Sequence, residues 1–312
     1  MSVSAVEVSS VSHRYGDTAA LSDISLRIAA GSLTGLLGPN GSGKTTLFRL
    51  LATLLPVQSG QISVFGHNVD NEASKVREQL GVTFQSPALD GRLTVAENLW
   101  CHGRMYGISR NRLKDRIKSG LQRLDLHERR NDRVEQLSGG LRRRVELAKG
   151  LLHSPRILLL DEPSTGLDVL ARRRFWDLLD DVRRTDSTTI VVSTHLMDEA
   201  DRCDQLFLLN AGRVVKSGSP ADMQCSIEGE RLTVRCRDAA NAAPVIERLL
   251  GAAPTVRGDR LSLRVIGASE HVPRLMKELR DNIIAVEVAQ TSLDDVFVEL
   301  TGRGLAEETS TD

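Results

Sequence analysis

The sequence predicts a mostly parallel α/β domain that is followed by a smaller α+β domain. Strand patterns alternate with helix patterns through most of residues 1–225, which is typical of a parallel sheet covered by helices on both faces. A glycine-rich segment joins one buried strand to a helix within this part. Residues 226–312 follow a different order of strands and helices, so we expect a second domain there.

The elements of the first domain follow from the spacing of its apolar residues. Alternating apolar and polar residues predict two half-buried strands at 5–15 and 21–30. Short apolar runs predict further strands at 33–38, 61–66, 81–85, 156–163, 187–194, 204–210 and 213–218. Helical spacing predicts helices at 44–55, 171–184 and 196–203. Residues 86–152 lose strand character, and helical patterns at 94–107, 110–126 and 141–152 predict a helical subdomain.

The second domain has its own order of elements. From residue 231 to residue 290 the patterns read strand, helix, strand, strand, helix, strand, which is the order of ferredoxin-like domains. A last helix is expected at 292–303. The acidic tail "AEETSTD" that follows is expected to be disordered.

Composition excludes several classes of protein. Lys and Arg number 41, as do Asp and Glu, so the 312 residues lack the basic excess that nucleic-acid-binding proteins usually show. No run approaches the roughly 18 apolar residues of a membrane span, and the first residues do not resemble a secretory signal. The four cysteines form no C-x-x-C pair, so we expect free thiols in a reducing compartment.

The segment "GPNGSGKTT" at 38–46 fits the phosphate-binding pattern G-x-x-x-x-G-K-[ST]. Its glycines let successive backbone N–H groups face phosphate oxygens. Lys44 would neutralise β- and γ-phosphate charge, and Thr45 would offer its hydroxyl to Mg²⁺. An ordinary glycine-rich turn is the alternative, but the preceding strand and following helix favour nucleotide binding. The expected nucleotide-binding residues are Gly38, Pro39, Asn40, Gly41, Ser42, Gly43, Lys44, Thr45 and Thr46.

The segment "ILLLDEP" at 157–163 is a second candidate for this chemistry. Its apolar residues end in two carboxylates at the carboxyl end of a strand, where ligands bind in such sheets. Asp161 would hold Mg²⁺, and Glu162 would act as the general base on the attacking water. Taken alone, the pattern also fits a strand that ends in solvated acids.

A second helix end that favours anions occurs at "LSGGLRRR" (137–144). Ser138 can cap a helix, and the free N–H groups after it, at Gly139 and Gly140, attract anions. An ordinary capped helix is the alternative. We expect Arg142, Arg143 and Arg144 to form one solvated face of this helix.

With "STGLD" (164–168) and "STH" (193–195), these motifs resemble those of ABC-transporter ATP-binding subunits, over about residues 4–220. The C-terminal domain and "TSLDDVFVELTGR" further resemble subunits that serve daunorubicin-resistance-type exporters with ABC-2 permeases. The resemblance implies a P-loop NTPase α/β fold: a mixed-sheet core, an antiparallel β subdomain, a helical subdomain and an accessory C-terminal domain. It also implies ATP and Mg²⁺ as cofactors.

The resemblance assigns a role to the second helix end. In this family two ATP-binding domains pair head to tail, as a homodimer or a heterodimer, so Ser138, Gly139 and Gly140 would face ATP held by the other subunit. The family's signature usually ends in Gln, whereas Leu141 stands here. We expect the signature to remain competent, because Ser138 and backbone groups make the phosphate contacts.

Further roles follow from the resemblance. Tyr15 would stack on adenine, and Asp168 would bridge the two subunits. Gln85 would approach Mg²⁺ and the attacking water, and His195 would contact the γ-phosphate. The expected catalytic residues are thus Glu162, His195, Gln85 and Lys44, and the expected metal-binding residues are Thr45, Gln85 and Asp161.

The function expected from the resemblance is ATP hydrolysis that powers a separate membrane permease, from the cytoplasmic face of the membrane. Export of a drug, an antibiotic or a lipid-like compound is expected, and the accessory domain would add dimer contacts or regulate closure. One alternative is a non-transport ABC ATPase that acts on nucleic acid or ribosomes, but such proteins usually carry long coiled coils or two cassettes. The other is a small-molecule kinase, which would leave "LSGGL" and "STGLD" unexplained.

Overall fold

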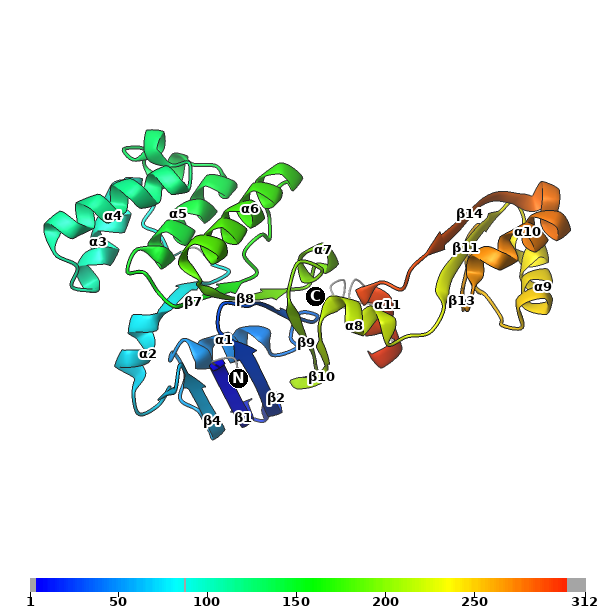
Figure 1. Cartoon of the computed structure of the whole chain (residues 1–312), viewed down its shortest axis with the longest axis horizontal. Coiled ribbons are helices and arrows are strands. Elements are labelled where there is room, and N and C mark those ends of the chain that lie inside the picture. Colours follow the sequence, from blue (N-terminus) through cyan, green and yellow to red (C-terminus); the bar gives the residue numbers. More distant parts are fainter. Residues whose placement is uncertain (1–3, 87, 302–312) are drawn as a thin grey trace. The chain divides into compact units, whose positions relative to one another are not determined.

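The computed structural model of the chain describes residues 4–86 and 88–301 (Figure 1). Contacts between residues divide the chain into two compact units, with the division after Ser219. Each unit has a sheet and a buried core of its own. In the part of the chain that the structure describes, no helix is both long and apolar enough to cross a membrane.

A six-stranded sheet forms the centre of the first unit. Its order is β10-β9-β3-β8-β7-β6, with every strand parallel except β10, which pairs antiparallel with β9. The strands β3, β7 and β8 are buried along their whole length, as their apolar runs predict. The strands are β3 (Leu33–Leu37), β6 (Leu80–Thr83), β7 (Ile157–Asp161), β8 (Thr189–Thr194), β9 (Gln205–Asn210) and β10 (Arg213–Gly218).

Helices cover this sheet, and an antiparallel sheet packs beside it. Helix α1 (Lys44–Leu51) lies on one side of β7 and β8, and α6 (Val169–Asp186) lies on the other (Figure 1). The second sheet has the order β2-β1-β4-β5, and one apolar core joins it to α1 and the central sheet. Its strands are β1 (Ser4–Tyr15), β2 (Thr18–Ala29), β4 (Ser59–Val64) and β5 (His67–Asn68).

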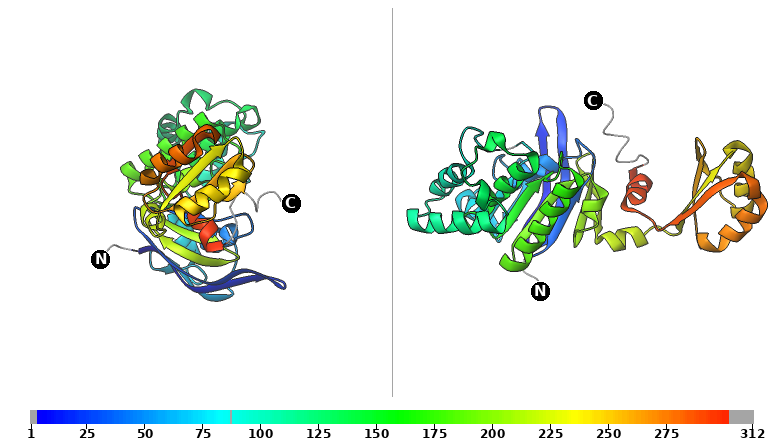
Figure 2. Two further views of the ribbon diagram at one scale, coloured as in Figure 1. Left: turned by 90° about the vertical axis from the view of Figure 1, so that its right-hand side faces the viewer. Right: turned by 90° about the horizontal axis from the view of Figure 1, so that it is seen from above.

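The predicted helical subdomain is present. It contains α3 (Val95–Met105), α4 (Arg110–Arg123) and α5 (Gly139–Leu151), on the side of the unit opposite β1 and β2 (Figures 1 and 2). A capping box of Thr94 and Glu97 starts α3. A Cβ at Gly103 would lie 2.2 Å from a Leu113 methyl group, so any larger residue would require the Leu113 side chain to move.

The second unit contains the predicted ferredoxin-like pattern. Its antiparallel sheet has the order β12-β13-β11-β14, as expected when two β-α-β crossovers interleave. The elements are β11 (Glu230–Cys236), α9 (Ala239–Leu250), β12 (Thr255–Arg257), β13 (Arg260–Val265), α10 (Ala268–Leu279) and β14 (Ile283–Ala289). Helices α8 (Pro220–Cys225) and α11 (Leu293–Thr301) contact each other in the same unit. The acidic tail lies outside the described residues.

The predicted fold class is therefore confirmed, with local differences. The structure adds β5, α2 (Ala73–Gln79) and α8, which are too short to give a clear period in the sequence. Helix α1 ends at Leu51, short of the expected residue 55, because the chain turns through a positive φ of 59° at Thr53. Helix α7 (Met197–Ala200) is a single turn rather than the expected 196–203.

Candidate functional site

The glycine-rich loop between β3 and α1 needs its glycines for two reasons. Gly41 and Gly43 adopt φ angles of 77° and 102°, in the region that favours glycine. A Cβ at Gly38 would lie 2.3 Å from the Leu209 carbonyl oxygen, and one at Gly43 would lie 2.6 Å from that of Ala20. The loop is thus held between β9 and the β1–β2 hairpin, with its N–H groups at the start of α1.

Lys44 is buried in this loop, with 4% of its surface exposed. Its Nζ donates hydrogen bonds to the carbonyl oxygens of Gly38 (2.7 Å) and Pro39 (2.8 Å). Burial lowers the pKa of Lys44, and the nearby carboxylates of Glu162 and Asp161 oppose this shift. The loop therefore presents one cation at the carboxyl ends of the parallel strands, where a nucleotide phosphate would need it.

Asp161 ends β7 and is 1% exposed. Its Oδ1 accepts hydrogen bonds from Ser193 and, at 3.4 Å, from Thr45 Oγ1, whereas its buried Oδ2 has no partner. A buried carboxylate oxygen without a partner is costly, and carboxylate and hydroxyl oxygens suit Mg²⁺. Thr45 and Asp161 therefore fit the expected metal. Among the described residues, no three His, Cys, Asp or Glu side chains form a group that could hold a metal ion.

Glu162, the residue after β7, is the centre of a second cluster. Its backbone has a φ of 46°, and its N–H donates to the carbonyl (3.2 Å) and hydroxyl (2.9 Å) oxygens of Ser193 on β8. Its Oε2 accepts from Gln85 Nε2 (3.3 Å) and Thr165 Oγ1 (3.2 Å). Its Oε1 lies 3.4 Å from His195 Nδ1, close enough for an ion pair but not aligned as a hydrogen bond. Non-glycine residues with positive φ often occur at functional sites.

The environment of Glu162 keeps its carboxylate ionised. The imidazole of His195 is the main cause that lowers the pKa of Glu162, burial acts in the opposite sense, and Lys44 and Thr165 lower it further. An ionised, oriented carboxylate can accept a proton from water. The structure thus brings Gln85, Glu162 and His195 together, with the Gln85 amide hydrogen-bonded to the Glu162 carboxylate.

The second helix end has the predicted form. Ser138 caps α5 and accepts a hydrogen bond from the N–H of Leu141 (3.4 Å). Gly140 packs closely on α6, where a Cβ would lie 3.1 Å from Ala171 Cβ. Gly139 lines a hollow of about 270 Å³ together with Gln85 and Glu162. Among the described residues, Ser138 makes no hydrogen bond to the glycine-rich loop of its own chain.

Tyr15 and Asp168 both lie at the ends of elements. Tyr15 ends β1, is 44% exposed and packs edge-on against His13. Ala20, on the next strand of the same hairpin, lies against the glycine-rich loop, since a Cβ at Gly43 would lie 2.6 Å from its carbonyl oxygen. Asp168 caps α6 by accepting from the N–H of Ala171 (2.8 Å).

The prediction for the arginine triplet was wrong. Arg143 is only 8% exposed, and Arg142 and Arg144 are half-buried. Arg142 donates to the carbonyl oxygens of Leu137 and Glu135, near the start of α5. Arg143 reaches the backbone next to Glu162, so it belongs to the site. Arginine is normally exposed, and the acceptors that bring Arg143 to the site are backbone carbonyl groups, which the sequence does not reveal.

Sequence reasoning also missed a buried acceptor beside the site. Glu199 on α7 is 2% exposed and accepts hydrogen bonds from Thr194 (2.6 Å), Ser164 and Trp176 (3.2 Å). Thr194 directly precedes His195, so Glu199 fixes the backbone that carries the imidazole. An acidic residue in an apparently solvated helix gave no sign of this burial.

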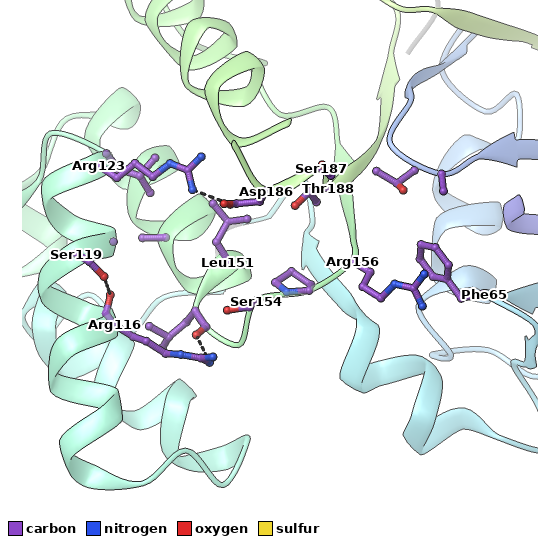
Figure 3. Close-up of a pocket in the computed structure, with 17 residues that line it drawn as sticks. Phe65, Arg116, Ser119, Arg123, Leu151, Ser154, Arg156, Asp186, Ser187 and Thr188 are labelled. Carbon is purple, nitrogen blue, oxygen red and sulfur yellow. Dashed lines mark hydrogen bonds and ion pairs between the residues drawn. The ribbon is translucent and has the colours of Figure 1, made fainter. Parts of the chain in front are cut away.

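A larger cavity, of about 700 Å³, lies at the other end of the strands (Figure 3). It is lined by Arg156 and Thr188, which precede β7 and β8, and by Arg116 and Arg123 of α4. Arg123 pairs with Asp186, Arg156 stacks on Phe65, and Arg116 donates to the Leu152 carbonyl. These guanidinium groups are already engaged, and the cavity lies away from the site at the carboxyl ends.

Comparisons with known proteins agree with this geometry. A family model described as "ABC transporter" matches residues 21–165. The daunorubicin resistance ATP-binding protein DrrA3 of Streptomyces coeruleorubidus is 38% identical over 308 residues, which cover 97% of each chain. This chain belongs to the ATP-binding proteins of ABC transporters. The Nod factor export ATP-binding protein I of Rhizobium etli is 35% identical over 97% of this chain and 95% of its own length.

Solved structures place this ABC protein in the same fold. A dimeric ATP-binding cassette in a post-hydrolysis state, bound to ADP and Pi, has 28% identity and a TM-score of 0.62. The match covers 69% of this chain and 98% of that one. The chain is therefore an ABC ATPase, which hydrolyses ATP to drive transport. ABC ATPases form dimers and pair with membrane permease subunits.

Proposed function

We propose that this ABC ATPase drives the export of a drug, an antibiotic or a lipid-like compound through a separate ABC-2-type permease. It would act from the cytoplasmic face of the membrane. The full-length similarity to daunorubicin resistance and Nod factor export proteins, C-terminal unit included, supports export over import. The observation that carries the ATPase role is the convergence of Lys44, Asp161, Glu162 and His195 at the carboxyl ends of three neighbouring strands.

The proposal assigns one role in ATP binding or hydrolysis to each group of the site. The glycine-rich loop and Lys44 would bind the nucleotide phosphates, and Tyr15 would stack on adenine. Thr45 and Asp161 would hold Mg²⁺, which when bound neutralises phosphate charge. Glu162 would take a proton from the attacking water, oriented by Gln85 and by His195.

Hydrolysis would require two ATPase subunits. Ser138 caps α5, and the free N–H groups at this helix end favour an anion, which supports its use on ATP held by a partner subunit. Asp168 caps α6, the helix that packs against the start of α5. The next two residues, Val169 and Leu170, are 78% and 71% exposed. A partner subunit that covered this apolar pair would bring the helix end at Ser138 to its own nucleotide. The C-terminal unit would add dimer contacts or regulate closure.

Transport by the intact system tests this proposal. The gene would be deleted in its native host and replaced by the wild-type gene, by Lys44→Ala or by Glu162→Gln. We expect cells with either variant to retain more daunorubicin or doxorubicin than wild-type cells, as the deletion strain does. Equal retention across a panel of drugs and antibiotics in all four strains would contradict drug or antibiotic export. ATPase activity stimulated by nucleic acid would instead favour the non-transport alternative.

A further inference from the structure

Arg143 makes an unusual set of hydrogen bonds for a residue on a helix. It lies on α5, the helix that Ser138 caps. Its side chain donates four hydrogen bonds, and in each the donor and acceptor atoms are 3.0 Å apart or closer. Its Nε donates to the carbonyl oxygen of Pro163 (2.7 Å), its Nη2 to that of Asp161 (3.0 Å) and its Nη1 to that of Phe84 (2.7 Å). One guanidinium thus joins three separate segments of the chain.

These carbonyl groups flank the residues of the hydrolytic cluster. Phe84 directly precedes Gln85, and Asp161 and Pro163 lie on either side of Glu162. Gln85 and Glu162 are themselves in contact, since Gln85 Nε2 donates to Glu162 Oε2 at 3.3 Å. The guanidinium therefore fixes the backbone on both sides of that contact, without touching either side chain.

Two further residues of α5 secure the same loop. Glu146, 2% exposed, accepts from Arg143 (2.8 Å) and from the N–H of Ala88 (2.7 Å). Lys149 Nζ donates to the carbonyl oxygen of Ala88 at 2.6 Å. Gln85 thus lies between two anchor points, Phe84 and Ala88, that are both held by α5. The buried guanidinium is compensated by Glu146, which makes the charge tolerable in this environment.

We propose that Arg143 is a positioning residue for ATP hydrolysis, which holds Gln85 and Glu162 in register through the backbone beside them. The inference rests on the roles proposed above for these two side chains. Ser138 caps the helix that carries Arg143. If a partner's nucleotide displaced this helix end, Arg143 would move with it and would shift the backbone beside Gln85 and Glu162. Only arginine suits this task, since its planar fork presents five donors in fixed directions, whereas lysine offers one nitrogen.

The test compares Arg143→Lys with a matched control, Arg123→Lys. Arg123 donates three hydrogen bonds, to Asp181 and Asp186 of α6, and among the described residues none of them reaches the site. We expect Arg143→Lys to lower kcat by about 10- to 100-fold, the scale of a misplacement near 1 Å. Its KM for ATP should stay within about threefold, because the glycine-rich loop is untouched. Arg123→Lys should retain kcat.

Two readouts separate positioning from a general loss of stability. In a double-mutant cycle, Gln85→Ala should cost less in the Arg143→Lys background than in wild type, because Gln85 is already misplaced there. Hydrogen exchange should become faster in peptides that contain Phe84 and Glu162 in Arg143→Lys, and should not do so in Arg123→Lys. If Arg143→Lys does not fold, Arg143→Gln combined with Glu146→Gln, which leaves no unpaired buried charge, replaces it.

Three results would overturn the proposal: kcat of folded Arg143→Lys within about twofold of wild type, an equal loss in Arg123→Lys, or full additivity with Gln85→Ala. Failure of the underlying roles gives a different result. In that case, Glu162→Gln and Gln85→Ala in the otherwise wild-type chain would themselves leave kcat unchanged, and the positioning role would fall with them.

Discussion

Glu162→Gln separates ATP binding from hydrolysis, because the new side chain can keep the contacts of the old one. The amide oxygen can accept from Gln85 and Thr165, and the amide N–H₂ can donate to His195 Nδ1. The free energy of unfolding should therefore change by less than about 1 kcal/mol. What the variant loses is the carboxylate that we propose accepts a proton from water.

The expected kinetic effect follows from that loss. Removing a general base costs about 10²- to 10⁴-fold in rate, or roughly 2.7 to 5.4 kcal/mol in the activation free energy. ATP affinity should not fall, because the side chains of Lys44 and Thr45 and the loop N–H groups remain. With Mg-ATP bound but not hydrolysed, the variant should accumulate as a closed dimer.

Light scattering with and without Mg-ATP measures this outcome, alongside phosphate release. We expect a shift from the 34.2 kDa of one chain to twice that mass only with Mg-ATP. Glu78→Gln, which neutralises an exposed carboxylate on α2, is the control and should behave as wild type. Phosphate release by Glu162→Gln within threefold of wild type would refute the role of Glu162, and a monomer that binds ATP would refute the site shared between two subunits.

Three further predictions follow from the same geometry. Lys44→Ala should weaken ATP binding by about tenfold or more in calorimetric titration without loss of fold, since the hydrogen bonds of Lys44 to Gly38 and Pro39 lie within one loop. Gly38→Ala should lower the free energy of unfolding in urea by about 1–3 kcal/mol because its Cβ would overlap a backbone carbonyl, whereas Gly139→Ala, with open space, should be near neutral. Burial first, then Lys149 and a neighbouring histidine, lower the pKa of His102 to about 4. As pH falls from 6.5 toward 4, the unfolded chain therefore binds a proton at His102 and the folded chain does not. The free energy of unfolding should decrease over this pH range, and it should decrease less in His102→Phe.

The parts of the site that can be predicted from the sequence are those formed by residues that follow one another in the chain. The glycine-rich loop is recognisable because backbone conformation demands glycine at Gly41 and Gly43, and because an apolar strand and a helix flank it. Asp161 and Glu162 could be placed together with it because parallel strands present their carboxyl ends at one edge of a sheet. Burial of a whole strand thus requires apolar residues, and a positive φ favours glycine, so both can be recognised from residue type.

Arg143 and Glu199 could not be predicted in this way. Both are charged residues on helices, where exposure is the default expectation, yet they are 8% and 2% exposed. Three of the four acceptors of Arg143 are backbone carbonyl groups, which every residue has, and only Glu146 is a side chain. Glu199 depends on hydroxyl and indole groups from three different segments. Such contacts are decided by tertiary packing and have no period or spacing that a sequence could reveal.

The proposed mechanism links the helix end at Ser138 to the hydrolytic cluster of the same chain through α5. At the start of α5, Ser138 and Gly140 are proposed to bind the partner's nucleotide, and Gly140 packs on α6 at Ala171. One turn further on, Arg143 holds the backbone beside Glu162. A rigid helix transmits a shift at one end to the next turn with little loss, since its hydrogen-bonded backbone deforms less readily than a loop. A nucleotide bound at Ser138 would therefore also shift the backbone beside Glu162, the proposed general base of the same chain. Binding of the partner's ATP would in this way precede and promote hydrolysis of the ATP in each subunit.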